Sequence, residues 1–371
     1  MTDSRSENSY YKQIDGLRFI SVFGVMVAHW YQNSFHREYL KELPFGTGVV
    51  FFFVISGFLI TQILLRFRLR NETEGNSQGK SILSFYMRRT LRIFPIYYLT
   101  IFVLYAIDFD QSHALLPWLL TYTLNIQMAI TNNLPGAFTH LWSLAVEEQF
   151  YLFWTFIIVF APKKFLKHLI ILFILISLAL KYYMFYKTSR WLGANTLVIT
   201  NMHSLGLGGL LAYYEVFRRE KFYTIGLGKM KAAMWLVLAV ILFLFAAFVP
   251  YDKLEFLKPY NDPLMTIVYG LAVFVAARNG FVGLGKYFLE NKVVVYFGRI
   301  SYGLYMYHLF MSPFYFNFVN HFLHWNITND KIYFVIFFVL DVLLATLSWF
   351  IIEKPILGLK KHFTYFLKEK K

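Results

Sequence analysis

Asp15, Arg18 and His29 are ionisable residues in a stretch that is otherwise apolar enough to cross a bilayer. Ionisable side chains are costly at membrane depth, so inside a span they indicate function. Arg18 and His29 are 11 positions apart, and at about 100° and about 1.5 Å per residue they share one helix face, roughly 16 Å apart. Asp15 lies three positions before Arg18 on the same face. We expect an acid–arginine pair at one level and a general base at another. The alternative is an interfacial histidine bonded to a carbonyl group or a lipid headgroup.

A cluster of arginines marks the segment between two later apolar runs. It comprises Arg66, Arg68, Arg88, Arg89 and Arg92. Arg89 and Arg92 are three positions apart and would share a helix face. Guanidinium groups bind phosphate bidentately, so this cluster could hold a phosphate-rich cosubstrate at the inner membrane face. The same arginines could instead serve only to set the topology of the loop.

Glu147 and Glu148 open another apolar run. Adjacent side chains on a helix point about 100° apart, so we expect only one of these acids to face an inner cavity. That carboxylate could orient His29 or contact an acceptor molecule. The alternative is an outer helix start, where acidic residues are favoured by the helix dipole.

Ser56 lies in an apolar run that also contains Gly48 and Gly57. It could contact a ligand or act as a nucleophile, although no G-x-S-x-G elbow surrounds it. Small residues at such spacing are also typical of close helix packing in membranes.

Two further ionisable residues, His308 and Asp341, lie inside apolar runs towards the C-terminus. At membrane depth Asp341 must be neutral, paired or facing water. Pairing of Asp341 with His308, Arg299 or Lys181 explains it as well as catalysis does. His308 and Asp341 are therefore secondary candidates.

The composition excludes several classes of protein and site. Hydrophobic residues make up 58% and charged residues 15% of the chain, whereas a soluble domain carries about 25% charged residues. Cysteine is absent, which excludes disulfides, thiolate nucleophiles, iron–sulfur clusters and cysteine zinc sites. The sequence has no HExxH, Walker or GxGxxG pattern, so it predicts neither a metal site nor a nucleotide-binding motif.

The elements that must position these residues are about ten transmembrane helices in an all-α, polytopic fold. They are expected at 14–31, 46–65, 94–108, 141–161, 168–186, 200–217, 231–249, 262–278, 297–318 and 331–352. With both termini in the cytoplasm, 28 of the 36 lysine and arginine residues fall on the inner side, as the positive-inside rule requires. This accounts for the net charge of +15 without nucleic acid. Residues 114–130 are then a re-entrant or interfacial segment.

In order along the chain, these stretches resemble the membrane-bound acyltransferase-3 family, the O-acyltransferases that modify bacterial surface glycans. The motifs that carry the resemblance lie at 15–29, 48–61, 88–95, 141–151, 301–308 and 353–355. The resemblance implies a multi-pass protein of the bacterial cytoplasmic membrane, a cytoplasmic acyl-CoA donor (acetyl-CoA by family frequency) and an extracytoplasmic glycan or lipid-linked saccharide as acceptor. It also implies essential roles for Arg18, His29 and the pair Arg89 and Arg92.

Combined with this resemblance, the residues predict a donor route through the membrane. Arg88, Arg89 and Arg92, with Arg66 and Arg68, would hold the CoA phosphates, and Arg18 beside Asp15 would contact the donor further in. The pantetheine arm would pass Ser56 and bring the thioester to His29, which deprotonates the acceptor or takes the acyl group itself. Glu147 or Glu148 would orient the imidazole or the sugar.

We expect a single transmembrane domain at 1–355, in the stand-alone form of the family, and a basic cytoplasmic tail at 356–371. Oligomeric state stays open. The alternative function is a polytopic transporter or flippase for a lipid-linked glycan, with the buried charges lining its pathway.

Overall fold

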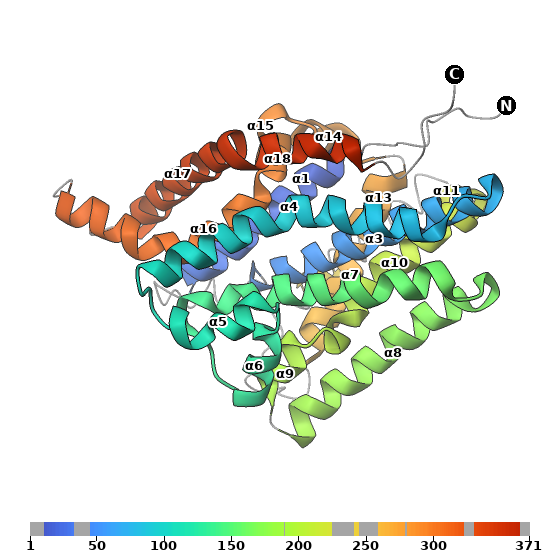
Figure 1. The fold of residues 1–371 in the computed structure, drawn as a ribbon, viewed down its shortest axis with the longest axis horizontal. Coiled ribbons are helices and arrows are strands. Elements are labelled where there is room, and N and C mark those ends of the chain that lie inside the picture. The colour runs from blue at the N-terminus through green and yellow to red at the C-terminus, as the bar shows by residue number, and fades with distance from the viewer. Residues whose placement is uncertain are drawn as a thin grey trace.

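The structure is a computed structural model that describes residues 11–32, 45–188, 190–224, 241–244, 259–278, 280–322 and 330–363. Every regular element in these ranges is a helix, which confirms the all-α prediction. The long helices run roughly side by side along the longest axis of the molecule (Figure 1).

The first three long helices carry most of the basic candidate residues. Helix α1 (Lys12–Val27) continues into a π-helical turn (Ala28–Gln32) that contains His29. Helix α3 (Gly48–Glu74) follows a short 3-10 turn (Phe45–Thr47), and α4 spans Gln78–Ala106. Gly75, with φ of 66°, ends α3 in the left-handed conformation that favours glycine at this position.

The segment between α3 and α4 differs from the loop that the sequence predicted. Almost all of 66–92 is helical, with a short turn near Gly75. Its charges pair along the helix, Arg68 with Glu72 and Arg70 with Glu74, and such pairs four residues apart stabilise a helix. The arginines therefore project from rigid helices rather than from a loop.

Residues 114–130 do not form one straight span. They fold into two short helices, α5 (Ser112–Leu120) and α6 (Leu124–Thr131), each too short to cross about 30 Å of hydrocarbon. Tyr122, with φ of 52°, lies in the turn between them. This agrees with a segment that does not span, and its re-entrant or interfacial placement stays a prediction.

The remaining helices complete the bundle. They are a 3-10 turn (Gly136–Leu141), α7 (Trp142–Phe160), α8 (Lys163–Lys187), α9 (Trp191–Thr196), a 3-10 turn (Ile199–Asn201), α10 (Met202–Phe217), α11 (Arg219–Thr224), α13 (Asn261–Arg278), α14 (Gly283–Leu289), α15 (Lys292–Arg299), α16 (Ser301–Asn317), a π turn (Phe318–Phe322), α17 (Asp330–Ser348), a π turn (Trp349–Glu353), α18 (Lys354–Gly358) and a 3-10 turn (Leu359–His362). Most of the span predicted at 231–249 lies outside the described residues.

Four helical segments of the described ranges are long and apolar enough to cross a membrane. They are Gly48–Glu74, Gly136–Phe160, Lys163–Lys187 and Lys331–His362, with a fifth if α13 and α14 form one broken span. These segments support an integral membrane protein. The count of ten spans and the cytoplasmic termini stay predictions.

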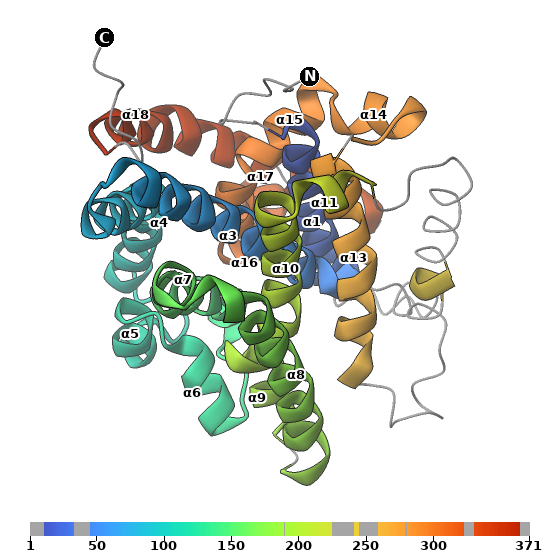
Figure 2. The same cartoon turned by 90° about the vertical axis from the view of Figure 1, so that its right-hand side faces the viewer.

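Helix α10 lies inside the bundle, where it packs against α3, α8 and α13 (Figure 2). Close approach to α3 depends on two glycines, because a methyl group on Gly57 would overlap the carbonyl group of Leu205, and one on Gly208 would overlap that of Val54. Gly48 likewise faces the backbone of Ser21 in α1. Gly48 and Gly57 are thus packing residues, as one interpretation of the sequence proposed.

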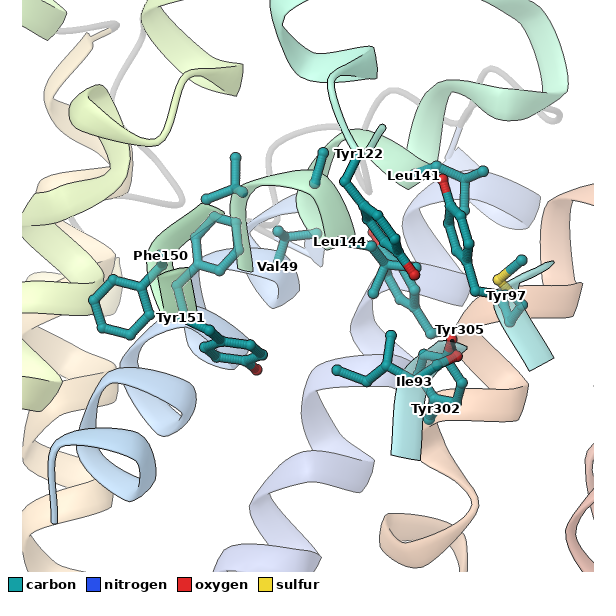
Figure 3. Packing of buried hydrophobic residues seen from close by; sticks show 14 of the residues in the cluster. Val49, Ile93, Tyr97, Tyr122, Leu141, Leu144, Phe150, Tyr151, Tyr302 and Tyr305 are labelled. Carbon is teal, nitrogen blue, oxygen red and sulfur yellow. Dashed lines mark hydrogen bonds between the residues drawn. The ribbon is translucent and has the colours of Figure 1, made fainter. Parts of the chain in front are cut away.

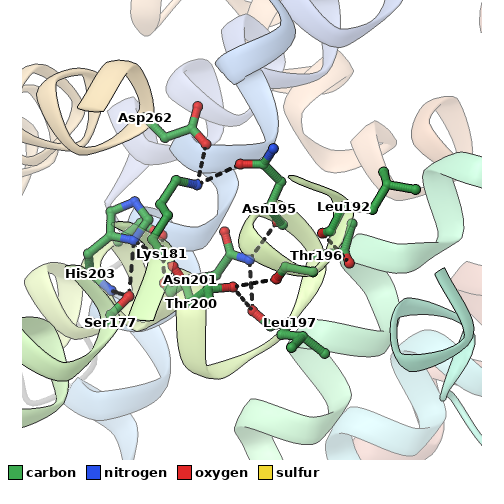
Figure 4. A network of polar contacts seen from close by, with 12 residues as sticks. Ser177, Lys181, Leu192, Asn195, Thr196, Leu197, Thr200, Asn201, His203 and Asp262 are labelled. Atoms are coloured by element: carbon green, nitrogen blue, oxygen red, sulfur yellow. Dashed lines mark hydrogen bonds and ion pairs between the residues drawn. The ribbon is translucent and has the colours of Figure 1, made fainter. Parts of the chain in front are cut away.

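A buried polar network ties α8, α9 and α13 together (Figure 4). The ammonium group of Lys181, which is 2% exposed, donates hydrogen bonds of 2.8 Å to Asp262 and 2.8 Å to Asn195. His203 of α10 lies beside it and bonds to Ser177 and to the carbonyl group of Thr200. The charge of Lys181 is therefore paired within this network, by Asp262.

Candidate active site

A cavity lies between α1, α3, α4, α7 and α16 and encloses about 800 Å³ of space not filled by protein atoms, part of it open to solvent. Its polar lining comes from five helices that are distant in sequence. The polar lining residues are Arg18, Ser56, Arg89, Arg92, Ser143, Glu147, Tyr151, Ser301, Tyr302 and Tyr305. The fold thus brings together candidates from four separate sequence motifs.

Three guanidinium groups converge on this cavity. Arg18 of α1 forms an ion pair of 3.9 Å with Asp15. Arg89 of α4 lies over the rings of Phe85 and Tyr151, and its Nε atom is buried without a hydrogen-bond partner in the described part of the chain.

Arg92, one turn further along α4, makes no hydrogen bond or ion pair with the described residues and is repelled by both Arg18 and Arg89. The Nε atom of Arg89 is a buried donor without an acceptor, and it calls for a bound group that supplies one. Phosphate oxygens match this set of donors.

Of the two adjacent acids, only Glu147 lines the cavity. Its carboxylate accepts hydrogen bonds of 2.8 Å from Ser56 Oγ and 2.8 Å from the hydroxyl group of Tyr151. Oε1 of Glu148 is buried without a partner among the described residues. Neither acid bonds to His29, so the geometry gives no support to either as the group that orients the imidazole.

His29 is oriented by a second histidine, His308. Nδ1 of His29 lies 2.8 Å from Nε2 of His308, and the two rings stack with centroids 5.1 Å apart. Nδ1 of His308 lies 2.8 Å from the carbonyl oxygen of Tyr305, so this nitrogen carries the hydrogen of a neutral ring and Nε2 is left as an acceptor. His29 must then donate from Nδ1, which leaves its Nε2 with a free lone pair. This tautomer suits a general base or a nucleophile.

Tyr305 lies between the cavity and the histidine pair. It lines the cavity, whereas His29 and His308 do not, and its ring centroid is 5.6 Å from that of His308. Its hydroxyl group bonds to Ser143 Oγ and donates to the carbonyl oxygen of His140. Figure 3 shows Tyr305 and Tyr302 beside Ile93 of α4, within the aromatic wall of the site.

Several residues of this site were not selected from the sequence as site residues: Ser143, Tyr151, Ser301, Tyr302, Tyr305 and His140. Tyr151 and Tyr305 lie one helical turn from Glu147 and His308, so helical spacing was the available signal. His140, which opens the 141–151 motif, packs edge-to-face on His308 at 5.1 Å and lies near the carbonyl oxygens of Ala137 and Met306. Its membership depends on packing of the 3-10 turn Gly136–Leu141 against α16, which no local pattern reveals.

The other three arginines of the predicted donor site lie outside the cavity lining. Arg66 pairs with Glu215 at 3.0 Å. Arg68 donates to the carbonyl oxygens of Ile158 and Ala161 at the end of α7, and Arg88 donates to those of Lys360 and Phe363. They hold helix ends and neighbouring segments together, so their geometry does not support a direct contact with the donor.

Asp341 is fully buried and accepts a hydrogen bond of 3.4 Å from Tyr315, while its second oxygen has no partner in the described ranges. The alternative of a pairing with His308, Arg299 or Lys181 finds no support in the described residues, where Asp341 bonds to Tyr315 of α16 and Lys181 bonds to Asp262. Asp341 does not line the cavity.

No group of three histidine, aspartate or glutamate side chains within the described ranges is arranged to hold a metal ion.

Residues 11–352 match the model of the acyltransferase-3 family, described as an acyltransferase domain. The chain belongs to this family. The match includes every residue that lines the cavity, so the arginines, the tyrosines and the histidine pair all lie within the acyltransferase domain.

The chain is also similar to curated bacterial proteins. It is 28% identical to the O-acetyltransferase OatA of Staphylococcus aureus over 382 residues, which cover 94% of this chain and 57% of that protein. It is 32% identical to the peptidoglycan O-acetyltransferase OatA of Listeria monocytogenes over 190 residues, 44% of this chain and 28% of that protein. A putative peptidoglycan O-acetyltransferase of Bacillus subtilis, YrhL, is 30% identical over 43% of this chain and 25% of its own length. The matched part thus covers little more than half of the Staphylococcus aureus protein and about a quarter of the other two. No solved structure matches it.

Proposed function

We propose that this acyltransferase-3 protein is an O-acetyltransferase that carries an acetyl group from cytoplasmic acetyl-CoA to a hydroxyl group of an extracytoplasmic glycan. The observation that carries the proposal is the convergence of Arg18, Arg89 and Arg92 on one cavity. Tyr305 also lines that cavity, and its ring lies beside His308 of the histidine pair. The proposal needs both an anion site and a base, and these residues could supply them.

The donor would bind with its phosphates on the guanidinium groups of Arg89 and Arg92. The buried, unpartnered Nε of Arg89 supports this, because it needs an acceptor that the described residues do not supply. Arg18, paired with Asp15, would contact the donor further along. Ser56 and Glu147 would line the path of the pantetheine arm towards Tyr305. The thioester of acyl-CoA supplies the activated acyl group.

The transfer step needs one proton acceptor, and Nε2 of His29 can be that acceptor. In direct transfer, His29 takes the proton of the acceptor hydroxyl, and the oxygen attacks the thioester carbonyl carbon. The carbon–sulfur bond then breaks, and the proton passes to the CoA thiolate. In the covalent route, Nε2 attacks the carbonyl carbon itself, the carbon–sulfur bond breaks and the CoA thiolate leaves. The sugar hydroxyl group then attacks the acyl carbon of the acyl-histidine, the carbon–nitrogen bond breaks, and the hydroxyl proton passes to the thiolate. Acetyl label retained by the protein after exposure to donor alone, and lost in His29→Gln, would favour the second route.

The acceptor that we propose is peptidoglycan or a lipid-linked saccharide precursor. Support comes from the names of two relatives, which are called peptidoglycan O-acetyltransferases. The predicted orientation in the cytoplasmic membrane would place His29, near the outer end of its helix, on the side where this polymer lies.

A transporter or flippase for a lipid-linked glycan is not favoured, since the family match is to an acyltransferase domain. The two functions differ in one simple property: a transporter does not cleave acetyl-CoA.

Release of free CoA thiol therefore tests the proposal. The full chain in detergent is mixed with acetyl-CoA and soluble peptidoglycan fragments, and thiol release is followed over time. We expect acceptor-dependent release that falls by about 10²–10⁴-fold in His29→Gln. His113→Gln is the matched control, because His113 is 53% exposed and distant in sequence from the site motifs. Wild-type protein that releases no more thiol than a protein-free blank, with any glycan acceptor, would refute the proposal.

A further inference from the structure

The segment after α17 lies against the arginine-bearing helix α4. The π turn Trp349–Glu353, α18 and the 3-10 turn Leu359–His362 all contact α4 (Figure 1). Arg88 fixes this segment, because its guanidinium group donates to the carbonyl oxygen of Lys360 at 3.1 Å and to that of Phe363 at 2.9 Å. Arg88 is one residue before Arg89, so the segment is held beside the helix that carries two of the cavity arginines.

Lys360 is the basic residue whose backbone Arg88 holds. It is half-buried, whereas its neighbours Lys361 and His362 are exposed. Its ammonium group is repelled by Arg92, Arg89, Arg88 and Arg18, in decreasing order. The ammonium group of Lys360 makes no hydrogen bond or ion pair with the described residues. Lys360 does not line the cavity itself. Its ammonium group nevertheless lies close enough to the cavity arginines to be repelled by them, and it is bonded to no acid in the described part of the chain.

Most acidic groups near these basic side chains already have a hydrogen-bond or ion-pair partner, and Glu148 attracts Arg89. Asp15 pairs with Arg18, and Glu147 accepts hydrogen bonds from two hydroxyl groups. Glu353, which is buried, attracts Arg92 and Arg18 and accepts a hydrogen bond from Ser348 at 3.4 Å. Lys360 and Arg89 keep unused donors, which is the condition that an anionic ligand relieves.

We propose that Lys360 is an additional donor-binding residue that contacts a phosphate group at the nucleotide end of CoA. Arg88 is then a positioning residue, which holds the backbone of Lys360 rather than the donor. This inference rests on the proposed function, since it assumes that the arginine cavity receives acyl-CoA. It assigns a binding role to a residue beyond the matched range 11–352.

The test is the affinity of the purified full chain for CoA, measured by calorimetry in detergent, for wild type, Lys360→Gln, Lys360→Arg and Lys361→Gln. Loss of one charged hydrogen bond should raise the Kd of CoA about tenfold in Lys360→Gln. Lys360→Arg should keep most of the affinity because it keeps the charge. Lys361→Gln removes the same charge from the exposed neighbour and should bind CoA as wild type does. The affinity for pantetheine, which has no phosphate, should be the same in all four proteins.

Equal CoA affinities of Lys360→Gln and Lys361→Gln would overturn the inference and leave the proposed donor intact. Loss of pantetheine and CoA binding together would overturn it as well, because the effect would then not concern a phosphate. Wild-type protein that fails to bind CoA at all would instead refute the proposed function.

A lipid headgroup could supply the same phosphate chemistry, so the titrations are repeated with phosphatidylglycerol in the detergent micelles. We expect Lys360→Gln to weaken CoA binding with and without this lipid. A defect that appears only as weaker binding of phosphatidylglycerol would assign the site to lipid and contradict the inference.

Discussion

At the scale of single residues, the chemistry depends on the position of one hydrogen between two imidazole rings. The carbonyl oxygen of Tyr305 fixes the hydrogen of His308, and His308 in turn fixes that of His29. His29 can be a base only if its Nε2 is the nitrogen without hydrogen. His308 is therefore a positioning residue that need not touch the substrate.

Removal of His308 should slow the chemical step without weakening the binding of the acetyl-CoA donor. In His308→Ala, Nδ1 of His29 loses its acceptor, and we expect kcat to fall about tenfold or more, less than the loss for His29→Gln. The KM for acetyl-CoA should not change, because His308 does not line the cavity. Steady-state kinetics against His113→Gln measure both quantities. A variant with unchanged kcat would show that His308 does not set the tautomer.

At the scale of elements, the site depends on how closely the helices that bear it can approach. Gly57 of α3 is one residue after Ser56 and faces the backbone of Leu205 in α10. A backbone carbonyl group cannot move aside as a flexible side chain can.

Gly57→Ala should therefore lower the free energy of unfolding by about 1–3 kcal/mol, which is typical of overpacking. Gly358→Ala is the matched control, since Gly358 is also helical and a methyl group there meets nothing within 4 Å. Thermal unfolding in detergent compares the two. Equal melting temperatures for Gly57→Ala and Gly358→Ala would contradict the packing role of Gly57.

The elements also show what a sequence can predict here. The long apolar runs at 46–65, 141–161 and 168–186 correctly predicted helices, because length and hydropathy can be judged from a local stretch of sequence. The face shared by Arg18 and His29 assumed a regular helix, but α1 ends at Val27 and His29 lies in a wider π turn. The extrapolated direction of His29 is therefore not that of a straight α-helix.

The candidate site was predictable only in part. The sequence predicted five residues that line the cavity, because charged or small residues are conspicuous inside apolar runs. They are Arg18, Ser56, Arg89, Arg92 and Glu147. The contact of His29 with His308 depends on packing between α1 and α16. The role of Arg68 depends on where α7 ends. No local sequence pattern reveals either of these contacts.

At the scale of the whole molecule, buried polar contacts join helices that the cavity does not use. Lys181 links α8 to α9 and α13 through Asn195 and Asp262. Lys181→Met should leave Asp262 as an uncompensated charge and destabilise the fold by about 3–5 kcal/mol. Removal of the exposed pair of Arg70 and Glu74 should cost about 0–1 kcal/mol. Thermal unfolding provides the comparison, and a melting temperature unchanged by Lys181→Met would argue against the network as a structural link.

The central claim is that one protein transfers an acetyl group from a donor bound in an arginine-lined cavity to a glycan, with His29 as the base or as the transient acyl carrier. Mass spectrometry of the cell-wall glycan tests it most directly, in a strain that lacks this protein and carries either the wild-type chain or the double variant Arg18→Gln, His29→Gln. We predict that O-acetylated sugars are lost in the deletion strain, return with the wild-type chain and do not return with the double variant. Full O-acetylation by a chain that lacks both side chains would contradict the account.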